Sequence, residues 1–122
     1  MRGDILIVDD QADVRAVLRE ILEVEGLTIR EAPDGETALR MCAERVPGVV
    51  FLDLSMPGMD GLEVLRALKA DERTASAKVV IVTARGEIAR AQGTAAGADE
   101  FFTKPFSPLA ILQLVENLLS EG

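Results

Sequence analysis

Five strand-like runs recur along this 122-residue chain, and stretches with helical spacing separate them. Several of the runs are continuously apolar and rich in β-branched residues, which is typical of strands buried on both faces of a parallel sheet. The alternation of such strands with helices requires right-handed crossovers and helices on both faces of the sheet. The sequence therefore predicts an α/β fold with a doubly wound, five-stranded parallel sheet. The predicted strands are 4–9, 27–32, 48–53, 78–84 and 99–104.

The first four helices are predicted from the spacing of apolar residues between the strands. Gly26 is expected to close the first helix and Asp34 with Gly35 to open the second. The fourth helical stretch, 86–99, contains three glycines, so we expect this helix to be the least stable and most mobile element. The side chains predicted to face the core are Val14, Val17, Leu18, Ile21 and Leu22, then Ala38, Leu39 and Cys42, then Leu62, Leu65 and Leu68.

The last helix has a specific start signal, with Ser107 as the N-cap residue and Pro108 at the first helical position. Its apolar arc is wider than one core stripe requires, so we expect that part of it either meets a partner or a second copy, or is buried broadly within the domain. No linker or repeat interrupts the series, so we expect one domain over residues 1–122. No output domain follows the last helix in this sequence, and the chain is either a stand-alone domain or part of a longer protein.

The composition excludes several functions. There is no histidine, which rules out histidine-ligated zinc, a Ser–His–Asp triad and a phosphohistidine of its own. A net charge of −8 argues against a nucleic-acid surface. With one cysteine no internal disulfide forms, and Cys42 is expected to be a buried apolar residue and not a redox sensor. No run is long enough to span a membrane and no signal peptide is seen, so we expect a cytoplasmic location without membrane contact.

Three acids stand where predicted strands end: Asp9 and Asp10 after the first, and Asp53 after the third. In parallel sheets, sites form beyond the carboxyl ends of the strands. If these two strands are neighbours, the carboxylates converge and repel one another unless a cation lies among them. Such oxygen ligands suit Mg²⁺. The alternative is that Asp10 caps the first helix while Asp53 lies in a solvated loop.

The fourth and fifth strands end in Thr83 and Lys104. Taken singly, these would be a turn residue and a surface charge. Together with the acids they place a hydroxyl and an ammonium group at the same crevice. This combination suits a phosphoryl group that arrives at a carboxylate, with its charge shared among metal, lysine and hydroxyl.

The segments ILIVDD, VVFLDLSMPGMDG, VVIVTA and AAGADEFFTKPF, in this order and spacing, resemble the receiver domain of bacterial two-component response regulators. The resemblance implies a flavodoxin-like, CheY-like fold with strand order 2-1-3-4-5 and five helices. It also implies a phosphoprotein in a phosphorelay signal transduction system that needs Mg²⁺, for which Mn²⁺ can substitute.

Residue by residue, the resemblance makes Asp53 the phosphoacceptor. Asp10 then binds Mg²⁺ directly, Asp9 holds it largely through water, and the backbone carbonyl of Ser55 is a further ligand. Thr83 becomes the switch hydroxyl and Lys104 the phosphate-binding lysine. The remaining implied features are an aromatic switch at Phe101, which lacks the tyrosine hydroxyl common in the family, and a cis peptide before Pro105.

The resemblance implies that Asp53 attacks a phosphohistidine on a histidine kinase or histidine phosphotransfer protein, which is covalent nucleophilic catalysis. The domain is then not an enzyme in the ordinary sense, but catalyses its own Mg²⁺-dependent phosphorylation and dephosphorylation, with Ser55 and Arg85 affecting the access of water. Phosphorylation is expected to change the face formed by the fourth helix, fifth strand and fifth helix, and so to control an output domain, an effector protein or a homodimer.

The sequence is less compatible with three other functions. A Mg²⁺-dependent aspartyl-phosphate phosphatase usually carries a second acid two residues after the nucleophile, where this chain has Ser55. A flavodoxin-like FMN carrier needs a phosphate loop after the first strand, and the acids there are unfavourable for it. A phosphorylation-independent interaction module would normally have lost Asp53, Lys104 or one of the acids, and this chain has kept them.

Overall fold

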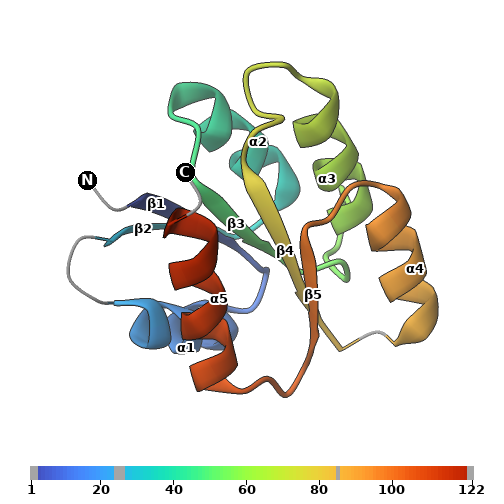
Figure 1. The fold of residues 1–122 in the computed structure, drawn as a ribbon. Helices are drawn as coiled ribbons and strands as arrows, with labels where there is room; N and C mark the ends of the chain where they lie inside the picture. The colour runs from blue at the N-terminus through green and yellow to red at the C-terminus, as the bar shows by residue number, and fades with distance from the viewer. Residues whose placement is uncertain (1–2, 24–26, 85, 121–122) are drawn as a thin grey trace.

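The computed structural model describes residues 3–23, 27–84 and 86–120, with the side chains of 87–89 and 120 left undescribed. Within these residues, strands and helices alternate along the chain (Figure 1). The strands are β1 (Gly3–Val8), β2 (Leu27–Ala32), β3 (Val49–Leu52), β4 (Lys78–Thr83) and β5 (Glu100–Thr103). The helices are α1 (Ala12–Leu22), α2 (Gly35–Glu44), α3 (Gly61–Ala70), α4 (Glu87–Ala95) and α5 (Pro108–Ser120).

The strands form one parallel sheet of five strands in the order β2-β1-β3-β4-β5. Helices α1 and α5 lie on one face of it, and α2, α3 and α4 on the other (Figure 1). The predicted doubly wound architecture and strand order are therefore confirmed. None of the described helices is both long and apolar enough to cross a membrane.

The central strands are buried on both faces, which explains why their sequences are continuously apolar. In β3, Val50 and Leu52 join the core under α2 and α3, whereas Val49 and Phe51 join the core under α1 and α5. Four of the five predicted strands differ from the structure by a residue at one or both ends, and only 27–32 is unchanged. The acids consequently lie just beyond the strands.

Two helix starts agree with the prediction from the sequence. The Asp34 side chain accepts a hydrogen bond from the Thr37 N–H at 2.7 Å, and Ser107 Oγ accepts one from the Ala110 N–H at 3.3 Å. A capping box at α3, between Asp60 and Glu63, was not predicted although its spacing is present in the sequence. Gly26 and Arg85 lie outside the described residues, so the roles expected of them have no structural description.

The prediction that Val17 faces the core is wrong, because its side chain is 48% exposed. Burial of α1 is centred on Leu18 and Leu22, and Val17 lies about 100° round the helix from Leu18. Val17 instead lines a surface groove of about 240 Å³ together with Asp13, Val14, Lys104 and Phe106.

Cys42 is buried in the core between the sheet, α2 and α3, as predicted. Burial raises the pKa of its thiol to about 11. The thiol therefore stays protonated at neutral pH and behaves as a small apolar group.

Helix α4 approaches the sheet closely at Gly93. A Cβ atom on this glycine would collide with Cδ1 of Ile81, a fully buried side chain of β4. The glycine that weakens α4 as a helix is thus what allows it to pack against β4.

We predict that Gly93→Ala lowers the free energy of unfolding by about 1–3 kcal/mol, because the new methyl group overpacks a closed core. Ile81→Val removes the obstructing Cδ1 atom and by itself costs about 0.5–1.5 kcal/mol. In the Ile81→Val background, Gly93→Ala should cost far less than it does alone. Urea unfolding of the four proteins measures this coupling, and additive effects would contradict the packing described.

Candidate functional site

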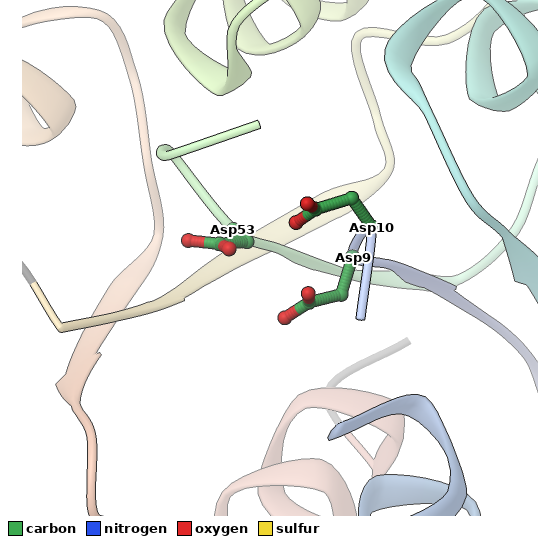
Figure 2. Close-up of side chains that lie close together, drawn as sticks. All are labelled: Asp9, Asp10 and Asp53. Carbon is green, nitrogen blue, oxygen red and sulfur yellow. The ribbon is translucent and has the colours of Figure 1, made fainter. Parts of the chain in front are cut away.

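The register of the sheet brings the three acids together. Val8 of β1 pairs with Leu52 of β3, and the Asp53 N–H donates to the Val8 carbonyl at 3.0 Å. Asp9 and Asp53 are therefore the first residues beyond two adjacent strands. Figure 2 shows their side chains and that of Asp10 gathered at these strand ends, with the carboxylates pointing the same way.

The three carboxylates are close enough to share one cation, since one oxygen from each lies within 4.8 Å of the others. Asp9 and Asp53 are only 2% and 5% exposed, whereas Asp10 is exposed. Gln11 occupies the N-cap position of α1 and makes no side-chain capping bond. The alternative that Asp10 caps the helix and Asp53 lies in a solvated loop is therefore wrong.

Lys104 reaches the cluster from the end of β5. Its Nζ atom lies 3.0 Å from Oδ2 of Asp9 and 3.6 Å from Oδ2 of Asp53. Its backbone N–H donates to the Thr83 carbonyl at 2.8 Å, which ties the ends of β4 and β5 together. The peptide between Lys104 and Pro105 is cis, as expected.

Asp9 shows the electrostatic cost of the cluster. Burial raises the pKa of its carboxyl group above the ordinary 3.8, and the neighbouring charge of Asp53 adds to the rise. Hydrogen bonds from the Gln11 N–H and from Lys104 oppose it. The charged form of Asp9 is therefore less favourable in the folded protein than in water, and a further cation beside it would offset that cost.

A pocket of about 280 Å³ opens over Asp53. Inside it, the Ser55 N–H donates to Oδ1 of Asp53 at 3.1 Å. The pocket is large enough for a phosphoryl group. It is lined by Asp10, Gln11, Asp53, Ser55, Ala84 and Lys104.

The two residues predicted to form a switch lie inside the protein. Thr83 is fully buried at the end of β4, and Ala84 lines the pocket in its place. Phe101 is 7% exposed and packs in the core on the α4 side of the sheet, with the guanidinium carbon of Arg90 4.7 Å from its ring centroid. The ring already occupies a buried position in this structure.

Comparison with known proteins identifies the family of the chain. A family model described as the response regulator receiver domain matches residues 5–116. The chain belongs to this family. The predicted resemblance is confirmed, and the chain is the receiver domain of a two-component response regulator.

Curated relatives of this receiver domain include the transcriptional regulatory protein ResD of Bacillus subtilis, 42% identical over 116 residues. Another is the phosphate regulon transcriptional regulatory protein PhoB of Pseudomonas aeruginosa, 38% identical over 116 residues. Each match covers 94% of this chain but only 47% and 51% of the relatives, respectively. The receiver domain thus spans about half the length of these curated proteins.

Solved structures agree with the fold of the receiver domain. A putative response regulator from Chloroflexus aurantiacus superposes with a TM-score of 0.91 at 31% identity, covering 98% of this chain and 99% of that one. The BeF3-activated receiver domain of DrrB gives a TM-score of 0.89 at 29% identity, with the same coverage.

Gly61 is a residue of the site that sequence reasoning missed. A Cβ atom there would collide with the carbonyl oxygen of Asp53 and lie 2.6 Å from Cα of Leu54. Helix α3 can therefore begin directly against the backbone of Asp53 only with glycine at this position. The glycine after Met59-Asp60 in the quoted motif was the available signal.

The residues present fit the Mg²⁺ that receiver domains bind at an acidic pocket. The donor set consists of carboxylates, Asp10 is exposed beside the pocket, and the electrostatic cost of burying the charge of Asp9 is only partly offset. Mg²⁺ prefers this hard oxygen chemistry and keeps water on its remaining positions.

We predict that Mg²⁺ raises the melting temperature of the domain, because it binds the folded cluster and not the unfolded chain. At ten times its dissociation constant, Mg²⁺ should add about 1.4 kcal/mol of stability. This corresponds to a rise of about 3–6 °C for a domain of this size. Calorimetric melting with Mg²⁺, and with NaCl at matched ionic strength, measures the effect.

Two variants and the pH dependence serve as controls. Asp10→Ala should lose most of the Mg²⁺ effect, and Asp53→Asn should melt higher than wild type without metal because one repelling charge is gone. The raised pKa of Asp9 means that its contribution to metal-free stability falls as pH rises through that pKa. The Mg²⁺ effect should conversely shrink as pH falls toward it, since protons compete for the carboxylate. An equal Mg²⁺ shift in Asp10→Ala would contradict the site.

Proposed function

We propose that Asp53 accepts a phosphoryl group and that Asp9, Asp10 and Lys104 make this possible. The observation that carries the proposal is the position of Asp53, buried at a strand end with two carboxylates and a lysine around its oxygens. A phosphorylation-independent module has no need of a buried carboxylate in this costly environment. The phosphatase alternative remains without its second acid, since Ser55 stands there.

In the reaction, one carboxylate oxygen of Asp53 attacks the phosphorus of a phosphohistidine. An oxygen–phosphorus bond forms and the phosphorus–nitrogen bond breaks, and the imidazole leaves with the bonding electron pair and takes up a proton. Lys104 is placed to pair with the phosphoryl oxygens once its contact with the Asp53 carboxylate is replaced. Mg²⁺ held by Asp9, Asp10, Asp53 and the Ser55 carbonyl would supply further neutralisation of charge.

The same pocket would later admit water to the acyl phosphate, so that the domain catalyses its own dephosphorylation. Ser55 lines the pocket and is exposed, which supports the proposal that its side chain affects the access of that water. The hydrolysis returns inorganic phosphate and the free carboxylate of Asp53.

The proposed partners follow from the absence of histidine in this chain. The donor is a histidine kinase or a histidine phosphotransfer protein. The surface groove lined by Val17 lies beside the site, because Lys104 lines both the groove and the pocket. The recipient of the signal is an output domain, an effector protein or a second copy of the chain. We place the protein in the cytoplasm and treat residues 1–122 as one receiver domain.

Acetyl phosphate or a phosphorylated histidine kinase should add one phosphoryl group to the domain, at Asp53, only when a divalent metal is present. Intact mass spectrometry measures the addition, and peptide mapping after borohydride reduction locates it. Asp53→Ala should stay unlabelled because, among the described residues, Asp53 is the only buried carboxylate that both contacts Lys104 and lines the pocket; Asp9 also contacts Lys104 but does not line the pocket.

The matched control is Asp99→Ala, since Asp99 is also an aspartate paired with a lysine, Lys69 at 3.2 Å, but lies away from the pocket. It should be labelled like wild type. Lys104→Ala should retain some labelling because lysine neutralises charge and is not the nucleophile. Labelling that persists in Asp53→Ala would refute the assignment.

We further propose that Thr83 and Phe101 carry the signal from the pocket to α4, β5 and α5. Thr83 directly precedes Ala84, which lines the pocket. On the adjacent strand Thr83 pairs with Thr103, and Phe101 lies two residues before Thr103. The buried ring under Arg90 corresponds to the end point of the movement expected on phosphorylation. Phosphorylation would then stabilise this arrangement over one in which the ring lies outside.

Beryllofluoride, a phosphoryl mimic, should change amide NMR shifts and hydrogen exchange mainly in residues 84–119. Thr83→Ala should reduce these changes without abolishing phosphorylation, because the proposed role of the hydroxyl is to move toward the phosphoryl group after Asp53 has accepted it. The control is Thr103→Ala, which should behave as wild type. Thr103 is in register with Thr83 on the adjacent strand but is exposed. Changes confined to the acids at the strand ends would contradict the switch.

A further inference from the structure

The backbone of Asp9 is held by a side chain outside the acidic cluster. Its N–H donates to the Ala32 carbonyl at 3.2 Å, while its carboxylate accepts from the Gln11 N–H at 2.9 Å and from Lys104 at 3.0 Å. Its carbonyl oxygen accepts a hydrogen bond of 2.7 Å from Nη1 of Arg15 on α1. This last bond crosses the turn between β1 and α1 and is made by a charged donor.

Arg15 is itself held in place by β2. Its Nε atom lies 3.0 Å from Oε1 of Glu31, and its side chain is only 16% exposed. Arg19 binds the other oxygen of the same carboxylate. These two arginines lower the pKa of Glu31, so the carboxylate stays charged and keeps its ion pair with Arg15. The rigid fork of the guanidinium therefore has two fixed contacts, one on Glu31 and one on Asp9.

The bond to the Asp9 carbonyl sets the direction of Asp10. That carbonyl and the Asp10 N–H belong to one planar peptide unit, so fixing the oxygen fixes the plane that leads into Asp10. Asp10 is exposed, and Gln11 caps α1 without a side-chain bond. Two bonds to Asp9 therefore hold this turn: the Gln11 N–H binds the Asp9 carboxylate at 2.9 Å, and Arg15 binds the carbonyl of the peptide that leads into Asp10.

We propose that Arg15 is a positioning residue of the metal site, which orients the peptide between Asp9 and Asp10 and so presents Asp10 to Mg²⁺. The proposal rests on the proposed function of the acidic cluster. In this proposal Arg15, held in place by Glu31, orients the metal ligands Asp9 and Asp10 but does not itself bind the metal. Groups that orient metal ligands in this way are commonly worth 10- to 100-fold in metal affinity, as a rough range.

The charge of Arg15 and its positioning role predict opposite changes in Mg²⁺ affinity when Arg15 is replaced. A cation near the cluster repels Mg²⁺, so removal of the charge alone would tighten Mg²⁺ binding. Loss of the bond to the Asp9 carbonyl would weaken it, because Asp10 is then free to turn away. The sign of the change in affinity therefore separates the two effects.

The test measures the Mg²⁺ dissociation constant by titration calorimetry on the 122-residue chain. Arg15→Met should raise it by about tenfold, and Arg15→Lys, which keeps the charge and one donor, should lie between Arg15→Met and wild type. In metal-free protein, the amides of Asp10 and Gln11 should exchange faster in Arg15→Met. With acetyl phosphate, the Mg²⁺ concentration for half-maximal labelling should rise while the rate at saturating Mg²⁺ stays near that of wild type.

Arg19→Met is the matched control. Arg19 binds the same Glu31 and also donates to a backbone carbonyl, that of Ile29 at 3.2 Å, but does not contact Asp9. Its loss should lower stability by an amount similar to Arg15→Met and leave the Mg²⁺ dissociation constant within twofold of wild type. Arg15→Lys keeps the test valid if Arg15→Met fails to fold.

The outcomes are distinguishable. Unchanged or tighter Mg²⁺ binding by Arg15→Met and Arg15→Lys, or equal weakening in Arg19→Met, overturns the role of Arg15 while the metal site stands. If wild type and Asp10→Ala are alike in binding no Mg²⁺, the proposed function fails and the role of Arg15 fails with it.

Discussion

Repulsion among the carboxylates of Asp9, Asp10 and Asp53 is the interaction around which this site is arranged. The pairing of β1 with β3 places two of these groups in nearly dry positions at adjacent strand ends. Lys104 and the N–H groups of Gln11 and Ser55 offset part of the cost. The pKa of Asp9 is nevertheless raised, first by burial and then by the charge of Asp53, so the offset is incomplete. The apolar sheet, buried on both faces, supplies the stability that lets the fold hold such a cluster.

An incomplete offset suits a domain whose state must change with its ligands. A cluster that is fully neutralised within the protein would gain little from Mg²⁺ or from a phosphoryl group. Here each arriving charge alters the balance among Asp9, Asp53 and Lys104, and their neighbours at the ends of β4 and β5 are tied to Lys104 through the Thr83 carbonyl. Under the proposed function, this link would couple local electrostatics to the side of the molecule that carries α4 and α5.

The residues that shape the site extend beyond those that face the pocket. Gly61 lets α3 begin against the backbone of Asp53, Gly93 lets α4 pack on β4, and Arg15 anchors the carbonyl of Asp9. Each acts through backbone placement and contributes no group to the pocket wall. In each case a helix contacts the strand, or the end of the strand, that directly precedes it in the chain.

The sequence by itself determined the order of strands and helices, the strand ends at which Asp9, Asp10, Asp53 and Lys104 stand, and, through the family motifs, the strand order. It could do so because periodicity and chain order are properties of single elements, and the carboxyl ends of parallel strands must meet at one edge. Only the tertiary structure decided that Val17 is exposed, that Ala84 and not Thr83 lines the pocket, that Phe101 is buried under Arg90, and that Arg15 holds Asp9. These depend on how far each helix is rotated against the sheet and on which rotamer each side chain adopts. Both are settled by packing between distant segments, which the pattern within any one segment does not specify.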